Sequence, residues 1–334
     1  MPACSQCRAP AVTFLRYSGR RLCREHFLDF FERRAKMQLS RQGRLPEGTL
    51  AVALSGGKDS VSVLHFLHGL TRDHPRIDLV AVTVDEGIAG YRSGSLEICR
   101  RLTSELGVPW RVVRTEDMAG YTIDAYAAGR AGPGDGRAEG APASPIDAQG
   151  PPGLVPAEGA PASRPRPACG PCGVFRRLGV NRLAKEAGAD AVVTGHNLDD
   201  TAQTVLMNVL KGDLERLARL APHADPAEGL VPRLVPFRTI PEKEVLLYAL
   251  LHGLPVHDEA ECPYAARSQR FALRDMLLDL EARSPGTRHA LVRMQDRLKP
   301  ILMEHLPQPA LAACPACGEP TSGKGCKACA WKTA

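Results

Sequence analysis

Residues 50–60 read Leu-Ala-Val-Ala-Leu-Ser-Gly-Gly-Lys-Asp-Ser. The apolar run at 50–54 predicts a buried strand, and the apolar run at 61–67 predicts the helix that follows it. A loop between such a strand and helix directs free backbone N–H groups and the positive end of the helix dipole at an anion. We therefore predict a phosphate-binding loop at residues 55–60, called the phosphate loop below. A plain glycine turn is the simpler alternative.

The side chains of the phosphate loop suit this role. Gly56 and Gly57 allow the backbone to close tightly around a phosphate, Lys58 adds a mobile positive charge, and Ser55 and Ser60 supply hydroxyl groups. The Gly-x4-Gly-Lys-Ser/Thr spacing of a Walker A loop is absent. The pattern Ser-Gly-Gly-x-Asp-Ser instead resembles the PP-loop of ATP pyrophosphatases, which cleave ATP between the α and β phosphates. The resemblance implies that this loop binds ATP.

Strand and helix signals alternate through the central part of the chain. Further buried strands are predicted at 79–84, 110–113 and 191–194, and helices at 95–106 and 173–187. This alternation predicts an α/β fold with a doubly wound parallel sheet, in which ligands bind outside the carboxyl ends of the strands. Three motif-bearing loops follow strands in this way, at 55–60, 85–92 and 195–200. We predict that they share one pocket.

The second and third loops contribute further candidate nucleotide-binding residues, namely Asp85, Gly195, His196 and Asp199. We expect Asp199 or Asp200 to hold Mg²⁺ or to position ATP, with the alternative that Asp200 only caps the helix at 201–210. Asp59 is expected to orient the phosphate loop or Mg²⁺ rather than to act as a base. For His196, packing within the loop and a role as general acid both stay open.

The length and charge of the chain set the broad class. A chain of 334 residues exceeds a single comfortable core, which predicts one α/β domain with smaller modules. The net charge of +6 is compatible with a polyanionic partner without establishing one. No apolar run reaches transmembrane length, so we predict a cytoplasmic protein with no membrane partner. Basic residues crowd the first 45 positions: Arg8, Arg16, Arg20, Arg21, Arg24, Arg33, Arg34, Lys36, Arg41 and Arg44.

A cytosolic location implies that the eleven cysteines serve metals or chemistry rather than disulfides. Only Cys99 belongs to no group. Two terminal sets have the spacing of four-ligand zinc sites, Cys4, Cys7, Cys23 and His26 at the beginning and Cys314, Cys317, Cys326 and Cys329 at the end. We predict two structural zinc ribbons, each closed around its own Zn²⁺ with no open ligand position. Chance pairing or disulfides are the alternatives.

These signals divide the chain into modules. We predict a zinc ribbon at residues 1–30, a linking helix at 31–48, a PP-loop ATP pyrophosphatase domain at 49–305 and a second zinc ribbon at 306–334. Residues 128–168 are rich in Ala, Gly and Pro and lack apolar periodicity. Such a composition cannot bury enough surface to order itself, which predicts a flexible insertion that acts as a solvated spacer.

Three cysteines lie between the terminal sets in a second pattern, Cys169, Cys172 and Cys262. Three thiolates are one short of a structural tetrahedral site, but they suit a [4Fe–4S] cluster with one iron open to a ligand such as sulfide. A Cys-x2-Cys pair at a helix N-terminus is equally typical of a redox or persulfide pair with a lowered thiol pKa. A purely structural pair is a third alternative, and the spacing alone does not decide.

Taken in order, these motifs cover nearly the whole chain. They are the N-terminal ligand set, the phosphate loop, Asp85-Glu-Gly-Ile-x-Gly-Tyr-Arg92, Cys169-Gly-Pro-Cys172-Gly, Gly195-His-Asn-x-Asp-Asp200-x-Ala-Gln-Thr204, Cys262 and the four-cysteine tail. This order resembles the tRNA 2-thiouridine synthetases of the TtuA/Ncs6/TtcA superfamily, and the terminal ribbons resemble its TtuA and Ncs6-like branch. The resemblance implies a [4Fe–4S] cluster on Cys169, Cys172 and Cys262. It also implies tRNA as substrate, a thiocarboxylated ubiquitin-like protein or free sulfide as sulfur donor, and a homodimer.

The implied reaction is ATP-dependent 2-thiolation of a tRNA uridine. The C2 oxygen attacks the α-phosphorus of ATP, pyrophosphate departs, and sulfur then replaces the activated oxygen at the cluster. Lys58 is expected to offset the charge that develops on pyrophosphate. The other residues expected to carry these steps are Asp59, Asp200, Cys169, Cys172 and Cys262, with Mg²⁺ as a cofactor. Arg176 and Arg177, one turn beyond Cys172, either reach a phosphate or form a solvated helix face.

Three other functions stay open from the sequence. A persulfide-based sulfurtransferase would use the same cysteines without a cluster. Another PP-loop amidotransferase, or a lysidine-type ligase, would use ATP without the three lone cysteines. A zinc-ribbon RNA-binding or scaffold protein would use the nucleotide only to gate binding, although an intact phosphate loop argues against this. Release of pyrophosphate in the presence of tRNA separates an enzyme from such a binding protein.

Overall fold

The computed structural model describes residues 2–43, 45–130, 166–222, 228–256, 262–265, 269–307 and 310–332. Its strands are β1 (Thr13–Leu15), β2 (Arg20–Leu22), β3 (Gly48–Ala53), β4 (Ile77–Asp85), β5 (Trp110–Arg114), β6 (Ala189–Val193), β7 (Arg233–Leu234), β8 (Ala312–Ala313) and β9 (Pro320–Thr321). Its helices are α1 (Arg24–Arg41), α2 (Lys58–Thr71), α3 (Arg92–Leu106), α4 (Thr115–Ala119), α5 (Ile123–Ala127), α6 (Cys169–Glu186), α7 (Leu198–Leu210), α8 (Leu214–Ala218), α9 (Glu242–Leu251), α10 (Gln269–Arg283), α11 (Thr287–His305) and α12 (Lys327–Ala330). Most of the predicted insertion at 128–168 lies outside the described residues.

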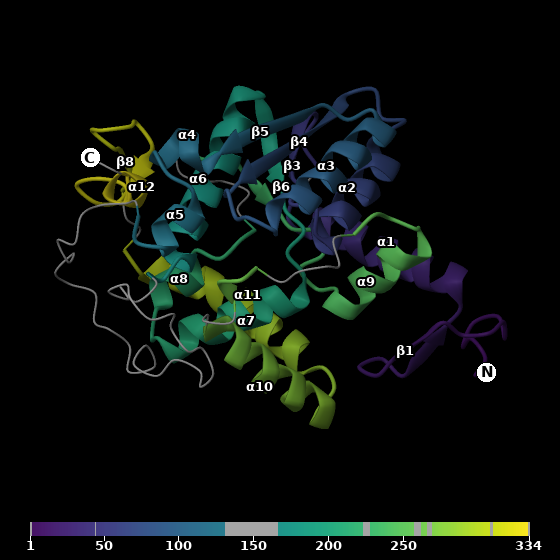
Figure 1. Ribbon diagram of the computed structural model, residues 1–334. Helices are drawn as coiled ribbons and strands as arrows, with labels where there is room; N and C mark the ends of the chain where they lie inside the picture. Colours follow the sequence, from purple (N-terminus) through teal and green to yellow (C-terminus); the bar gives the residue numbers. More distant parts are fainter. Residues whose placement is uncertain are drawn as a thin grey trace, which may run out of the picture.

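Five parallel strands form the central sheet, in the order β5-β4-β3-β6-β7. The central strand β3 pairs with β4 from Gly48↔Ile77 to Ala53↔Val82, and with β6 on its other side. A run of small and branched apolar residues suits this position, because both faces of the strand are covered. The predicted doubly wound parallel sheet is confirmed (Figure 1). Sequence reasoning missed the edge strand β7, since two residues carry no periodicity.

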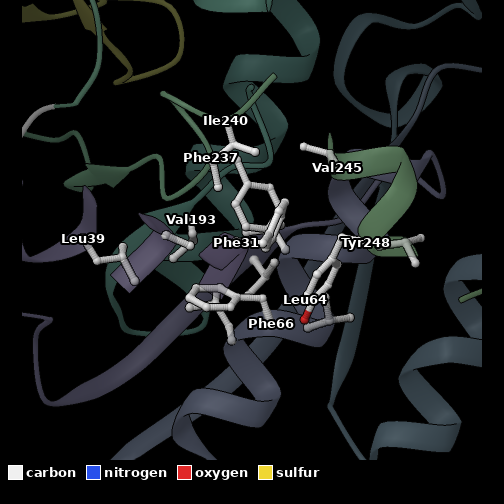
Figure 2. Close-up of a cluster of buried hydrophobic side chains, with 14 of the residues drawn as sticks. Phe31, Leu39, Leu64, Phe66, Val193, Phe237, Ile240, Val245 and Tyr248 are labelled. Carbon is white, nitrogen blue, oxygen red and sulfur yellow. The ribbon is translucent and has the colours of Figure 1, made fainter. Parts of the chain in front are cut away.

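Different helices cover the two faces of the sheet. Leu50 and Val52 of β3 belong to a large buried cluster that includes residues of α1, α2, α3 and α9. Ala51, which lies between them, belongs to a cluster beneath α6 on the opposite face, as the alternation of side chains along a strand requires. Figure 2 shows the large cluster, in which Phe31 of α1 stacks on Tyr248 of α9 with ring centroids 4.3 Å apart. Burial of each large apolar side chain stabilises the fold by about 1.5–3 kcal/mol.

The two terminal modules dock on different parts of this domain, and they lie at opposite ends of the molecule in Figure 1. β1 and β2 form an antiparallel hairpin, and the chain runs from Cys23 directly into α1, whose Phe27 belongs to the large cluster. The helix therefore begins inside the segment expected to be the ribbon. At the other end, Cys314 and Trp331 pack in a cluster with Phe175 of α6. Both modules are thus anchored through buried side chains.

A helical layer of α7, α10 and α11 completes the domain. Leu198 of α7, Leu277 of α10 and Val292 of α11 share one buried cluster. Beside it, Arg288 of α11 donates to the carboxylate of Asp199 on α7, and both side chains are almost fully buried. The pair holds α11 against α7, because separating the two helices would leave two buried charges without a partner. No described helix has the length and apolar character needed to span a membrane.

Candidate functional site

The phosphate loop joins β3 to α2 in a conformation that suits an anion. Gly56 has φ of 84°, and an added Cβ there would collide with the backbone of Ser95, so the position requires glycine. Ser60 Oγ accepts a hydrogen bond from the Ser55 N–H at 3.0 Å and lies 3.1 Å from Ser55 Oγ. Because α2 begins at Lys58, the N–H groups of its first turn have no partner within the helix. They can therefore donate to a phosphate.

Lys58 lies between two carboxylates at the mouth of this loop. Its Nζ is 2.6 Å from Glu242 Oε1 and 3.1 Å from Asp59 Oδ2. Burial opposes the charged form, but attraction to Asp59 and Glu242 prevails and raises the pKa of Lys58, so the side chain is an ammonium group at neutral pH. Sequence reasoning missed Glu242, because it lies 184 residues from Lys58 and belongs to no motif.

The three motif-bearing loops are in direct contact, as expected of loops that share one site. From the third loop, Asn197 Nδ2 donates to Asp59 Oδ1 at 3.1 Å. An added Cβ at Gly195 would lie 2.6 Å from the Asp59 carbonyl oxygen, so glycine permits this close approach. From the second loop, Arg92 Nη1 donates to the Ser55 carbonyl oxygen at 2.9 Å. Both neighbouring loops therefore hold the phosphate loop in place.

Asp199 is a buried anchor. One of its oxygens accepts from Arg288, and the other accepts from the Glu242 backbone N–H at 2.8 Å. With both oxygens engaged, Asp199 fixes the start of α9 and so places the Glu242 side chain against Lys58. A part for Asp199 in nucleotide binding stays a prediction, and these contacts favour an indirect one, through the position of Glu242.

Asp200 has the capping role that the sequence left as an alternative. Its side chain and that of Asn197 form a reciprocal capping box at the start of α7, and Asp200 Oδ1 also accepts from Arg270 Nη1 at 3.2 Å. Asp200 also acts on Asp59: burial first, and repulsion from Asp200 after it, raise the pKa of Asp59 to about 6. Two neighbouring carboxylates at a phosphate loop are the oxygen ligands that Mg²⁺ prefers. Binding of Mg²⁺ there stays a prediction.

In the second loop, Asp85 makes a local contact, whereas Glu86 makes the contacts to other elements. Asp85 Oδ1 accepts from the Gly87 N–H at 3.0 Å and so holds its own turn. Glu86 is buried and pairs with Arg92 at 2.7 Å and with Arg176 of α6 at 3.2 Å. This ion pair links the loop to the helix that carries the cysteine pair. The sequence offered only a weak signal for it, a Glu and an Arg in the same motif.

Basic side chains surround the third loop. His196 is accessible to solvent with Nδ1 3.0 Å from Thr194 Oγ1, yet desolvation by the surrounding protein lowers its pKa, so the ring is neutral at pH 7. Arg176 is held by Glu86. Arg177 is exposed and has no ion-pair partner within the described ranges. Of the two arginines singled out from sequence, Arg177 is therefore the one available to a phosphate.

The cysteine pair lies in the first turn of α6, which begins at Cys169 and not at Gly173 as predicted. The helix extends back through Pro171 because the N–H groups of a first turn need no helical partner, so proline is tolerated there. Residues three apart on a helix lie on one side of it, so Cys169 and Cys172 face the same region. This earlier start of α6 places both thiols at the helix N-terminus.

Long-range contacts bring Cys262 to the same region. Cys172 and Cys262 pack against one buried cluster, which consists of Ile88, Ile123, Ala127 and Ala168. Tyr264 donates to Asp124 Oδ1 at 2.6 Å and so fastens this segment to α5, and Cys169 Sγ lies 3.6 Å from the Tyr264 carbonyl oxygen. The three thiols are therefore brought into one region of the fold.

The surroundings do not favour a free thiolate here. Burial raises the pKa of Cys172 to about 12, and burial also raises the pKa of Cys169. A reactive redox or persulfide pair needs the opposite shift. A bound metal deprotonates a thiol directly, so a raised pKa is no obstacle to a metal ligand.

The terminal ligand sets have the geometry of single-ion sites. In each set all four ligand atoms lie within 4.8 Å of one another. Sγ of Cys23 is 3.2 Å from His26 Nδ1 and 3.6 Å from Cys7 Sγ, and Sγ of Cys317 is 3.4 Å from Cys326 Sγ. Zn–S bonds of about 2.3 Å give tetrahedral edges of about 3.8 Å, so both sets fit one Zn²⁺ each. The predicted grouping of these eight residues is confirmed.

Comparison with known proteins decides the family. Residues 4–28 match the N-terminal LIM domain of the 2-thiouridine synthetase TtuA, and residues 29–131 match the PP-loop domain. The chain is 35% identical to the tRNA 2-thiolation protein NcsA of Haloferax volcanii, over 98% of this chain and 97% of that relative. The chain belongs to the TtuA/Ncs6 superfamily of tRNA 2-thiolation proteins.

Other members of the TtuA/Ncs6 superfamily are similar along nearly the whole chain. The cytoplasmic tRNA 2-thiolation protein 1 of Bos taurus is 38% identical, over 98% of this chain and 86% of the relative. Among solved structures, the U34-tRNA thiolase NcsA from Methanococcus maripaludis with its [4Fe–4S] cluster superposes with a TM-score of 0.74. It is 29% identical, and the match covers 98% of this chain and 95% of that one. The resemblance stated from the motifs is confirmed.

Proposed function

We propose that this protein is an enzyme, an ATP-dependent tRNA-uridine 2-sulfurtransferase. One observation carries the proposal: the phosphate loop and the cysteines belong to one connected site. Arg92 contacts the Ser55 carbonyl oxygen and pairs with Glu86, and Glu86 pairs with Arg176, one turn beyond Cys172. An activated uridine and its incoming sulfur would therefore meet in one pocket. The printed names of the Haloferax volcanii and Methanococcus maripaludis relatives support the proposal.

The phosphate loop would carry the activation step. The uridine C2 oxygen attacks the α-phosphorus of ATP, the bond between the α-phosphorus and the bridging oxygen breaks, and pyrophosphate leaves. The first-turn N–H groups of α2 and the Lys58 ammonium group offset the negative charge that grows on pyrophosphate. The carboxylates of Asp59 and Asp200 would bind Mg²⁺ beside the pyrophosphate oxygens. Ser55, Gly56, Gly57 and Ser60 shape the cradle, and Gly195 lets the third loop close on it.

The three central cysteines would hold a [4Fe–4S] cluster. They fit this group by their number, by their gathering in one region and by the partial burial of Cys172 and Cys262. When bound, such a cluster supplies one iron with an open position for the incoming sulfur. The chain positions the site through α6, which carries Cys169 and Cys172, and through the Tyr264–Asp124 hydrogen bond, which places Cys262.

The test is a thiolation assay with full-length protein prepared and reconstituted without oxygen. Unmodified tRNA, ATP, Mg²⁺ and sulfide are supplied, and the tRNA is digested to nucleosides for mass spectrometry. We expect 2-thiouridine, with pyrophosphate released only when tRNA is present. Pyrophosphate without 2-thiouridine would identify another PP-loop ligase. Binding of tRNA without any release of pyrophosphate would identify a zinc-ribbon RNA-binding protein.

The terminal sets are proposed as zinc ribbons at residues 1–30 and 306–334. They flank a linking segment at 31–48, in which the helix α1 ends at Arg41 and not at 48 as predicted, and the catalytic domain at 49–305. Full-length protein is expected to contain about two zinc ions per chain by mass spectrometry of the metals. Cys7→Ser should lower this to about one and destabilise the N-terminal module without preventing ATP binding. Cys99→Ala, outside both sets, should keep both ions. Zinc far below two in the unmodified protein would contradict the assignment.

Binding of Mg²⁺ and ATP is expected to weaken as the pH falls through about 6, because protonation of Asp59 removes its negative charge and so a ligand of Mg²⁺. The pKa of Asp59 is raised above its ordinary 3.8, so ionisation between these values destabilises the ATP-free fold as the pH rises. Asp59→Asn should bind Mg²⁺ and ATP weakly at every pH, and its unfolding free energy should lose this pH dependence. Calorimetric titration measures the binding across this pH range, and denaturant unfolding measures the free energy of unfolding. An unchanged pH profile in Asp59→Asn would contradict the assignment.

Three further properties are proposed with the function. A cytoplasmic location is supported by the name of the Bos taurus relative. The sulfur donor is a thiocarboxylated ubiquitin-like protein or free sulfide, and assays with each donor distinguish them. A homodimer is the expected assembly, which light scattering of the purified protein checks.

A further inference from the structure

A second cavity lies between α1 and α11, outside the phosphate loop and the cysteine region. Its volume is about 460 Å³, within the range of ligand-binding cavities. Arg34 and Arg41 line it from one face of α1, and His289, Arg293 and Asp296 line it from one face of α11. With Gln38, which also lines the cavity between the two arginines, both sets follow a spacing of three or four residues, as one helix face requires. The cavity also borders Leu198, so it adjoins the third loop of the site.

The cavity has an excess of positive charge. Arg238, the fourth arginine of its lining, pairs with Asp296 at 2.7 Å, and Arg34 pairs with Glu244 at 2.6 Å. Arg41 and Arg293 are exposed and have no ion-pair or hydrogen-bond partner within the described parts of the chain. The guanidinium groups of Arg41 and Arg293 are therefore available to bind an anion. Arg34 and Arg41 belong to the N-terminal crowd of basic residues that the proposed reaction leaves without a role.

Its inner wall is buried and carries further hydrogen-bond donors. Arg238 is 2% exposed and is held by Asp296 and by the side-chain oxygen of Gln295. The ring of His289 packs against that of Tyr17 in a tilted arrangement, with centroids 4.6 Å apart. Both nitrogens of His289 are buried and bond to no group of the described chain, so its N–H is free to donate. Burial, with Arg34 next in effect, lowers the pKa of His289 to about 4, so the ring is a neutral donor at pH 7.

We propose that this cavity binds a phosphate group of the tRNA backbone. The identity of the RNA rests on the proposed function, whereas the position of the site rests on the cavity alone. A guanidinium group forms paired hydrogen bonds to phosphate oxygens, and Arg41 and Arg293 at the exposed rim are accessible to a polymer. A free phosphate compound shares this chemistry, and it is distinguished by the second arm of the test. The site would hold the RNA beside the third loop while its uridine enters the pocket.

The test compares tRNA affinity of full-length, metal-loaded protein and its variants across salt concentrations. Arg41→Gln and Arg293→Gln remove the two unpaired charges. Arg33→Gln on α1 and Arg283→Gln on α10 are matched controls, because both are exposed arginines paired with a neighbouring Asp outside the cavity. Each cavity variant should lower the slope of log K against log salt by about one and weaken binding by up to about tenfold near 0.1 M salt. The controls should change neither by as much.

The second arm measures thermal stabilisation of the same proteins by inorganic phosphate and by pyrophosphate, with ATP absent. Loss of tRNA affinity in the cavity variants alone supports a backbone phosphate. Unchanged tRNA affinity with lost stabilisation by phosphate overturns the RNA assignment and identifies a small anion as the occupant. Cavity variants that match the controls in both arms overturn the site itself. Failure of the thiolation assay would instead refute the proposed function and leave these affinity comparisons standing.

Discussion

Lys58→Ala is expected to lower tRNA-dependent pyrophosphate release by about two to three orders of magnitude, the usual effect of removing one preorganised charge from a transition state. The Lys58 ammonium group is the cation of the phosphate loop, held 2.6 Å from Glu242 and 3.1 Å from Asp59. Without it, the charge on the departing pyrophosphate meets two carboxylates instead. The measurement is pyrophosphate release at saturating ATP and tRNA.

The matched control is Lys243→Ala. Lys243 lies next to Glu242 but is exposed, so its loss should leave pyrophosphate release unchanged. Zinc content and the thermal unfolding midpoint should be retained in Lys58→Ala, since the loop lies at the edge of a formed sheet. Normal turnover by Lys58→Ala would show that the phosphate loop is not the ATP site.

Each of Cys169→Ala, Cys172→Ala and Cys262→Ala is expected to lose both iron and 2-thiouridine formation while ATP binding survives. A cluster with three protein ligands cannot keep its open iron when one ligand is removed, whereas the ATP site uses other atoms. The measurements are iron content, the visible absorption of oxygen-free protein, thiolation by nucleoside mass spectrometry and ATP affinity by calorimetry. Exposure to oxygen should stop thiolation before it stops ATP hydrolysis.

Cys99→Ala is the control, because Cys99 is buried on α3 and belongs to no ligand set. It should keep iron and activity and lose only some stability. A persulfide mechanism gives the opposite results: activity in iron-free protein, a trapped persulfide on one of the three cysteines and inhibition by alkylation. Full activity in air after removal of iron would refute the cluster.

The motifs that could be predicted from sequence are those whose geometry is local. The phosphate loop follows from a strand, two glycines and a helix start within eleven residues, and backbone sterics alone dictate its turn. The terminal ligand sets follow from Cys-x2-Cys turns, which place two ligand atoms together wherever they occur. The order of strands and helices indicated a parallel sheet, and a parallel sheet gathers the loops after its strands at one edge.

The sequence by itself therefore determined the fold class, the meeting of the three motif-bearing loops and the grouping of the two terminal ligand sets. Only the tertiary structure placed Glu242 beside Lys58, Arg288 against Asp199 and Cys262 beside the start of α6. It alone also formed the cationic cavity between α1 and α11. These contacts join segments tens to hundreds of residues apart, and the packing of buried helix faces decides them. A local pattern records which face of a helix is apolar, but not which distant element that face will meet.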